Sequence, residues 1–456
     1  MSDSPGLAPP RKGQSLFGNV CPETIPEHIV WWAITWTYPL WLMGGLYIVG
    51  SILGWLLLAL LLVKILAQDA DTPPHQRISI SWVIWLWILG MLILQVALLV
   101  GHLDYNYGLD VIVKSSIGWA KGWAALALYL LAAYLQIRPE IIIRAVCIIG
   151  LQTLLIVPLL LIAPHLHLPE FLYASPLKIF GGSGPEFFDV RLFEIDPTTD
   201  QLRWRLFAPW APALGMVGNI YFMLSLQEED TKWKLLGLAG AIVMCLICKS
   251  RLAFVCLFLV PAITMLVARL GRPMALSALG LASSLAGLFA PVVIDFFAGF
   301  WESFKAARAD STRVRGALNR IAFYRWETEA PIWGHGVVER GGHSVEWMPI
   351  GTHNTWAGLL FVKGLVGLLA MAVPMLATVG ALLWRGSNSR YQLGSVGFGL
   401  ILILCLYSFG ENLEILAYLY WPGIIVLGMA LKEPKAAPIE GGSFGVLGQG
   451  SFAQLP

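Results

Sequence analysis

A histidine and several arginines stand where polar segments of this chain meet long apolar ones. His353 lies within Gly351-Thr352-His353-Asn354-Thr355, at the end of a long polar segment and the start of an apolar run. An imidazole held there could take a proton from a hydroxyl group, and a positioned general base accelerates such steps by about 10²–10⁴. Guanidinium groups pair bidentately with phosphate oxygens. The pattern therefore favours proton transfer beside a bound phosphate.

The sequence predicts that His353 lies in the first turn of the helix that follows, with the Thr352 hydroxyl as its N-cap. The helix dipole would lower the pKa of an imidazole at this end, which suits a general base. A histidine at a helix start is more often structural when it is considered alone.

Arg251 follows Lys249 and Ser250 between two apolar runs that leave almost no room for a loop. An arginine at the centre of a membrane helix costs about 2.5–3.5 kcal/mol, so one kept near the membrane boundary usually faces a cavity or an anionic partner. The alternative is a cation at a helix end that reaches the interface. Because two cations on an outer face would oppose the positive-inside trend, we favour the anion-binding interpretation.

The segment from Asp295 to Gly351 predicts an amphipathic helix over Ser311–Trp326, with an approximate apolar stripe of Val314, Leu318, Ile321 and Phe323 to Tyr324. It also contains the basic cluster Arg308, Arg313, Arg315, Arg320 and Arg325. Most of these arginines are expected to decorate a solvated helix face. A phosphate site needs only one or two of them.

The composition indicates a membrane protein. The chain is 57% hydrophobic and 13% charged, with a mean hydropathy of +0.71, and its apolar runs leave no room for a separate soluble domain. The net charge of +2 does not suggest a nucleic-acid partner. Five of the six cysteines lie in apolar runs, which argues against a disulfide framework. Cys245-x-x-Cys248 has no further ligand-type residue on its apolar segment, so we expect packing there and no metal.

The apolar runs predict an all-α, polytopic membrane domain over residues 28–431 with about twelve transmembrane helices. The run Ile29–Leu66 is long enough for two helices with a turn near Gly44-Gly45. Further spans are expected at Ser81–Gly101, Ile117–Ile137, Ile141–Ala163, Pro209–Leu226, Trp233–Cys248, Leu252–Ala268, Met274–Phe296, His353–Leu383, Tyr391–Phe409 and Leu413–Leu431.

Basic residues between the apolar runs alternate in a way that places both termini in the cytoplasm. Residues 1–27 then form a cytoplasmic tail rather than a cleaved signal peptide, and residues 432–456 form a second, disordered one. The opposite face receives the segment around Asp104 and Asp110, residues 164–208, the turn 249–251, residues 410–412 and a large external loop, 297–352, before the tenth span.

Three sequence features in this order resemble the O-antigen ligase and polymerase superfamily of bacterial membrane glycosyltransferases. They are Ser250-Arg251-Leu252-Ala253, then an arginine-bearing helix ahead of Pro331-Ile332-Trp333-Gly334-His335-Gly336, and then His353-Asn354-Thr355 followed by Phe361-Val362-Lys363-Gly364-Leu365-Val366-Gly367. The likeness is specific over about residues 250–369 and only topological before them. It implies a multi-pass protein of the bacterial inner membrane.

The resemblance implies a glycan donor linked to polyprenyl diphosphate, and a glycan, lipid or protein acceptor, without a metal or other cofactor. It implies His353 as the general base, with Arg251 and Arg315 as diphosphate ligands. Arg313 and Arg320 compete with Arg315 for that role by their spacing. Arg203 and Arg205 look like the family's basic segment before a helix, but Trp210 replaces its usual asparagine.

A transporter or flippase of a lipid-linked or small anionic substrate is the alternative, because such proteins also have many spans. It predicts an internal repeat and charges near helix midpoints, and neither is clear in this sequence. The choice between polymerase and ligase, the sugar and the acceptor are not readable from these motifs.

Overall fold

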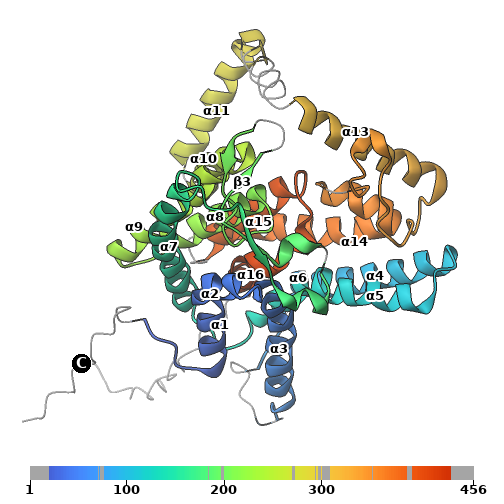
Figure 1. The fold of residues 1–456 in the computed structure, drawn as a ribbon. Coiled ribbons are helices and arrows are strands. Elements are labelled where there is room, and N and C mark those ends of the chain that lie inside the picture. Colours follow the sequence, from blue (N-terminus) through green and yellow to red (C-terminus); the bar gives the residue numbers. More distant parts are fainter. Residues whose placement is uncertain are drawn as a thin grey trace, which may run out of the picture.

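The structure, a computed structural model, is mainly helical, with 72% helix and few strands (Figure 1). It describes residues 20–69, 71, 77–182, 184–196, 200–269, 273–292, 294, 295, 299, 309–351, 353–387 and 393–432. Six helices in these ranges are long and apolar enough to cross a membrane: α3 (Leu46–Leu66), α4 (Trp82–Asp104), α7 (Pro139–Ile162), α10 (Arg251–Arg269), α14 (Thr355–Gly386) and α16 (Leu413–Ala430). These helices are compatible with a multi-pass membrane protein, but about twelve spans are not confirmed.

The remaining helices are shorter or more polar. They are α1 (Ile25–Thr35), α2 (Thr37–Leu42), α5 (Leu109–Lys121), α6 (Trp123–Ala132), α8 (Ala211–Ser225), α9 (Thr231–Ile247), α11 (Pro273–Leu288), α13 (Ala309–Glu329) and α15 (Gly394–Tyr407). Two antiparallel ribbons lie between α7 and α8: β1 (Phe171–Ala174) pairs with β2 (Asp189–Arg191), and β3 (Glu194–Ile195) pairs with β4 (Leu202–Arg203). Most residues of the two predicted tails, 1–27 and 432–456, lie outside the described residues.

Two glycines test the predicted helix boundaries. The turn expected near Gly44-Gly45 is confirmed, because α2 ends at Leu42, Gly44 has a φ of +66° and α3 begins at Leu46. The single span expected over Ile117–Ile137 is wrong, since α5 ends and α6 begins on either side of Gly122. The physical reason is a change of surroundings: none of the α5 side chains is buried, whereas every residue of α6 is.

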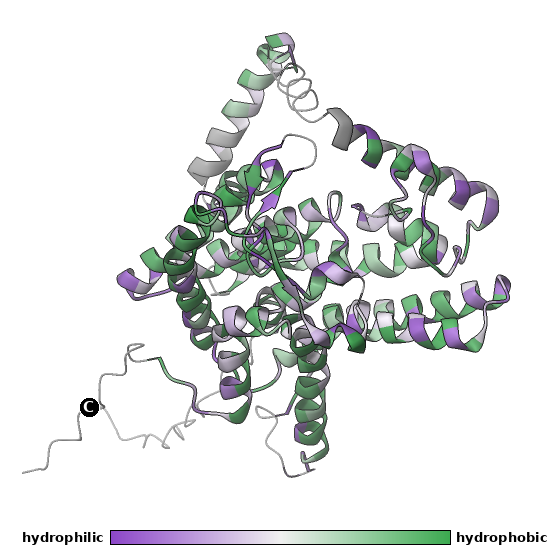
Figure 2. Ribbon diagram, viewed as in Figure 1, coloured by the Kyte–Doolittle hydropathy of each residue, from purple (hydrophilic) through white to green (hydrophobic). Residues whose placement is uncertain are grey.

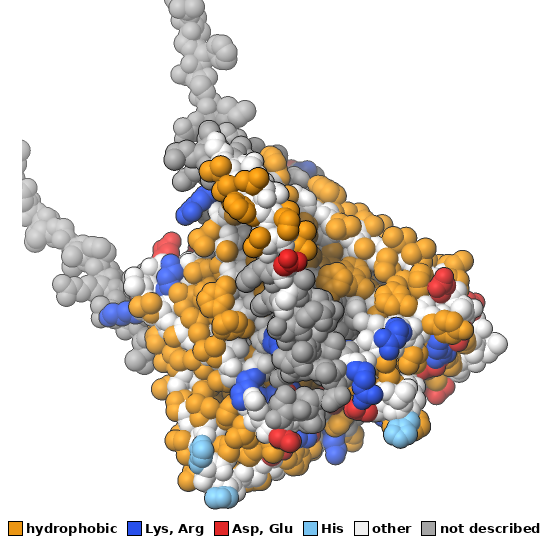
Figure 3. Space-filling model, turned by 90° about the horizontal axis from the view of Figure 1, so that it is seen from above, with side chains coloured by type: hydrophobic (Ala, Val, Ile, Leu, Met, Phe, Trp, Pro, Cys, Tyr) orange, Lys and Arg blue, Asp and Glu red, His pale blue; other side chains and the backbone are white. Residues whose placement is uncertain are grey.

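The packed interior and the outer surface are both apolar. Helix α6 packs against α3, α4 and α16, and α14 lies along α4 (Figure 1). Hydropathy colouring shows green over most of the helices, with purple concentrated in α13 and the β ribbons (Figure 2). Large side chains such as Trp32, Trp85 and Leu89 are exposed, and the face seen from above is mostly hydrophobic with scattered Lys and Arg (Figure 3). A surface this apolar suits lipid better than water.

Helix α14 is broken at Gly364, which has a φ of +63°. The loop Pro331–Gly336 pairs with the backbone groups that the break releases. The amides of His335 and Gly336 donate to the carbonyls of Phe361 and Val362, both at 2.9 Å. Beyond the break, the Leu365 amide donates to Pro331 and the Val366 amide to Ile332, at 2.9 and 3.2 Å. Two segments that the sequence analysis singled out separately therefore interlock, through four backbone hydrogen bonds on the two sides of the break.

Replacing Gly364 with alanine is expected to destabilise the protein. An added Cβ would collide with the Ile332 carbonyl oxygen, and the positive φ alone costs a residue with a side chain about 1–3 kcal/mol. The matched control is Gly380→Ala on the same helix, where an added Cβ meets nothing within 4 Å and helix propensity improves by up to about 1 kcal/mol. Thermal unfolding in one detergent compares the two. Equal midpoints for both variants would contradict the interlocking described here.

Candidate functional site at the start of helix α14

The first residues of α14 are tied to the turn between α15 and α16. The Thr355 amide donates to the Ser408 carbonyl at 2.9 Å, and the Thr355 hydroxyl donates to the Glu411 carbonyl at 2.7 Å. The Asn354 amide donates to the Asn412 side chain at 3.2 Å. Because Ser408 and Asn412 flank Glu411 in the chain, these bonds fix the position of Glu411 relative to the start of α14.

His353 lies just before α14, and its predicted place in the first turn is wrong. The helix begins at Thr355, and its N-cap is Asn354, whose side chain accepts from the amides of Trp356 and Ala357 at 3.0 and 3.2 Å. Thr352, the expected cap, lies outside the described residues. Asparagine is a strong N-cap residue and takes the role two positions later. His353 itself has a φ of +62° and stands on the loop.

Arg315 of α13 lies close enough to act electrostatically on both His353 and Glu411. Burial, and then the charge of Arg315, lower the pKa of His353 to about 4, so its imidazole is neutral at pH 7. Burial raises the pKa of Glu411 to about 7, against the opposing effects of Arg315 and of a hydrogen bond from Trp210. One arginine thus stands beside two titratable groups whose pKa values are displaced in opposite directions, a pattern that is typical of catalytic sites.

Glu411 and Trp210 are site residues that the sequence analysis missed. The Trp210 indole N–H donates to the Glu411 carboxylate at 2.7 Å, and the Glu411 side chain is buried. Trp210 was noted only as a substitute for the family's asparagine. The available signal was an acidic residue between two apolar runs, where an unpaired carboxylate would be costly.

Arg251 is the first residue of α10 and is half-buried. The predicted tight turn before it is confirmed: α9 ends at Ile247, and the Ser250 hydroxyl accepts from the Ala253 amide at 3.4 Å. This helix end packs beside the turn that contains Glu411, because the Leu252 side chain lies 3.5 Å from where a Cβ on Gly410 would stand. The structure thus brings Arg315 and His353 together and places Arg251 at the end of a helix that packs against the turn containing Glu411.

Helix α13 confirms the predicted helix and buries Val314 and Leu318, but Phe323 and Tyr324, also expected on the apolar stripe, are exposed. Arg313 and Arg320 are exposed on it, whereas Arg315 is half-buried. Arg308 lies outside the described residues. Arg325 pairs with two carboxylates, Glu329 and Glu339, and rests over the Phe361 ring at 5.1 Å. Among the described arginines of this cluster, Arg315 is the one that acts on His353.

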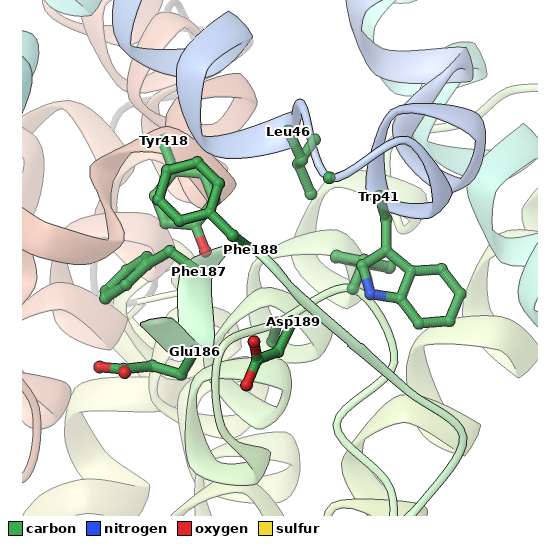
Figure 4. Close-up of a pocket in the computed structure, with 10 residues that line it drawn as sticks. Trp41, Leu46, Glu186, Phe187, Phe188, Asp189 and Tyr418 are labelled. Carbon is green, nitrogen blue, oxygen red and sulfur yellow. The ribbon is translucent and has the colours of Figure 1, made fainter. Parts of the chain in front are cut away.

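Arg203 and Arg205 make their contacts within the protein, around the β ribbons. Arg203 forms ion pairs with Glu194 and with Asp196, the second at 3.0 Å. Arg205 is buried and donates to the backbone carbonyls of Pro209 and Asp189. Figure 4 shows the Asp189 segment with Phe187 and Phe188 packed among Leu46 of α3 and Tyr418 of α16. Arg203 therefore holds the β3–β4 ribbon together, and Arg205 joins β2 to the segment just before α8.

His335 is fully buried and has both ring nitrogens bonded. One nitrogen lies 2.9 Å from the Phe361 carbonyl and the other 2.8 Å from the Glu329 carboxylate. Arg325, followed by His335, lowers the pKa of Glu329 to about 2. His335 thus locks the Pro331–Gly336 loop onto α14, and its nitrogens are not free for a substrate.

A cavity of about 690 Å³ lies beside the loop that carries His353, although His353 is not among the residues that line it. Its wall includes Gly351 and Thr355, the residues two positions before and after the histidine. Volumes of this size are typical of small-molecule sites. Helices α4, α5, α14 and α16 contribute apolar side chains, together with a few charged ones that include Lys114, Lys363 and Glu414. Among the described residues, no group of three or more His, Cys, Asp or Glu side chains is placed to hold a metal ion.

Comparison with known proteins finds no family model that matches the chain and no match among curated proteins.

The substitution Asn354→Ala is expected to destabilise the protein by about 0.5–2 kcal/mol, because two amides of α14 lose their cap. Asn354→Asp should retain most of the stability, since aspartate caps as well as asparagine does. Thermal unfolding of both variants under identical conditions measures the difference. Equal losses for the two variants would show that the cap is not what holds His353 beside α14.

Proposed function

We propose that the protein is a membrane glycosyltransferase of bacterial surface polysaccharide assembly. It moves a glycan from polyprenyl diphosphate to an acceptor hydroxyl, as O-antigen ligases and polymerases do. The observation that supports this proposal most is the neutral, half-buried imidazole of His353 with Arg315 beside it, at the edge of a cavity next to long apolar helices. A neutral base and a fixed cation are the two groups that such a transfer requires.

In the proposed reaction, the acceptor oxygen attacks the anomeric carbon of the donor sugar. The bond between that carbon and the phosphate oxygen breaks, and polyprenyl diphosphate leaves with the electron pair. His353 takes the proton of the acceptor hydroxyl. Arg315 and Arg251 stabilise the charge that develops on the diphosphate, while the prenyl chain stays in lipid.

We also propose that the site faces the periplasm from a bacterial inner membrane. Contacts between segments predicted on the external face support this proposal. The Trp204 amide donates to the Ile247 carbonyl at 3.2 Å, and Lys249 donates to Gln201 at 3.3 Å. Gly101 at the end of α4 lies against Gly336 of the large loop. A donor carried across the membrane on its lipid would then meet the acceptor outside the cytoplasm.

Removing the base or the cation is expected to abolish most of the transfer. With purified protein, a polyprenyl-diphosphate oligosaccharide and an acceptor, His353→Ala should lower kcat by about 10²–10⁴. Arg315→Gln should lower kcat/KM by about 10²–10³, because the leaving diphosphate loses its cation. Lys232→Gln, an exposed lysine in the first turn of α9, is the charge-matched control and should keep wild-type rates. Full activity in His353→Ala would disprove the assigned base.

The pH dependence of transfer should separate Glu411 from His353. The pKa of His353 is about 4, so kcat should stay constant from pH 8 to about pH 5 and fall only below it. Glu411 ionises near pH 7, and above that pH its carboxylate competes with the diphosphate for Arg315. The donor KM should therefore rise above pH 7 in the wild type and stay low in Glu411→Gln. A loss of kcat centred on pH 6.5 would instead mean that His353 titrates as an ordinary surface histidine.

A further inference from the structure

We propose that the cavity beside His353 is a glycan subsite in which Lys363 and Glu414 bind two hydroxyl groups of one sugar residue. This inference rests on the proposed function and deepens it, because it assigns the part of the protein that holds the sugar rather than the diphosphate. The two residues face the cavity from α14 and α16, on elements that the catalytic proposal does not use for chemistry.

Lys363 and Glu414 have hydrogen-bonding capacity that the described residues leave unused. The Lys363 side chain is only 3% exposed, and its ammonium group donates to the Leu94 carbonyl at 3.3 Å. An ammonium group has three donors, so two remain for a ligand. One carboxylate oxygen of Glu414 is buried and accepts no hydrogen bond from the described residues. Leaving such an oxygen unsatisfied is costly, which a ligand donor would relieve.

The chemistry of this pair selects hydroxyl groups over an anion. Lys363 and Glu414 act on each other electrostatically, so the pair is close to neutral as a unit. An oxyanion could accept from the lysine, but it has no proton to donate to the carboxylate and would be repelled by it. Neighbouring sugar hydroxyls can do both, since each hydroxyl donates one hydrogen bond and accepts others.

The rest of the cavity suits the apolar faces of a sugar ring. Trp119 and Trp123 line it, and the Trp119 indole is held in place by a hydrogen bond to the Met91 carbonyl at 2.8 Å. Lys121 donates to the carbonyls of Phe180 and Gly181 at 3.0 and 3.3 Å, which fixes the loop on the far side of the cavity. Rigid aromatic walls with a few convergent polar groups are typical of ligand sites.

The subsite also lies where a bound sugar can reach the proposed base. Gly351, Thr355 and Gly358 line the same cavity and surround the start of α14. A glycan held by Lys363 and Glu414 therefore shares its cavity with residues on both sides of His353 in the chain. The donor diphosphate would occupy the other side of His353, beside Arg315.

Binding to the full-length protein in nanodiscs tests the subsite without any chemistry. The probe is a neutral, lipid-free oligosaccharide repeat unit of the source organism's surface polysaccharide, and calorimetry measures its Kd. Glu414→Gln should weaken binding about 10-fold or more, because a charged acceptor is lost. Inorganic diphosphate at the same concentration should not displace the oligosaccharide.

A second variant keeps the test independent of any folding defect in Glu414→Gln. Gly118 of α5 lines the cavity, and a Cβ added to it meets nothing within 4 Å, so Gly118→Leu should fill the cavity without disturbing the fold. We expect at least a 10-fold loss of oligosaccharide binding. Gly280→Leu, at a helical glycine of α11 that is equally open and does not line the cavity, should bind as the wild type does.

The outcomes separate the two proposals. If both Glu414→Gln and Gly118→Leu bound the oligosaccharide with wild-type affinity, the subsite proposal would be wrong. The proposed function would still be tested separately, by the glycosyl-transfer assay. Displacement of the oligosaccharide by diphosphate would also overturn the subsite proposal, because the cavity would then be an anion site. If oligosaccharide binding requires Glu414 and the open cavity but the wild type transfers no glycan, the subsite is supported and the proposed enzymatic function is contradicted.

Discussion

The rest of this site depends on the break in α14 at Gly364, which leaves backbone groups without partners inside the helix. In apolar surroundings such groups must find partners within the protein. The Pro331–Gly336 loop provides them, and it can approach closely because Gly334, Gly336 and Gly364 all adopt positive φ. Satisfying the break therefore draws the segment between α13 and α14 against the membrane helices. The same segment then contributes Val337, Val338 and Ile350 to the cavity wall.

The charged groups of the site are arranged by this packing rather than by local sequence. Arg325, Glu329 and His335 form a closed set of ion pairs and hydrogen bonds that clamps the C-terminal end of α13 to the loop. Arg315 lies nearly three turns earlier on the same helix and is left to act on His353 and Glu411. A helix held at one end can thus present a single arginine at a defined place.

Much of the fold was predictable because hydropathy and breakers act locally. The turn at Gly44, the tight turn before Arg251 and the amphipathic character of α13 all followed from residues within one or two turns of each other. The break at Gly122 was not predictable in this way, since it depends on α5 staying outside the core while α6 enters it. The sequence also could not show that Asn354 rather than Thr352 caps α14, because either side chain can cap a helix.

The site itself was predictable only in part. The sequence singled out Arg251 by its position and His353 and Arg315 through a resemblance. The half-burial of Arg315 and its charge effect on His353 and Glu411 distinguish it from Arg313 and Arg320. Trp210, Lys363 and Glu414 could not be assigned from the sequence because their partners are far away in the chain, and Glu411 offered only the weak signal of an acidic residue between two apolar runs. Trp210 and Glu411, for example, are joined by a hydrogen bond across 201 residues.

The proposed reaction forms a glycosidic bond and releases polyprenyl diphosphate. The most direct test is to quantify both products with wild-type protein in vesicles that contain a labelled polyprenyl-diphosphate oligosaccharide and an acceptor glycan. We predict one released polyprenyl diphosphate for each new glycosidic bond. Movement of the intact labelled lipid from one leaflet to the other, with no new bond and no free polyprenyl diphosphate, would contradict the account and identify a flippase.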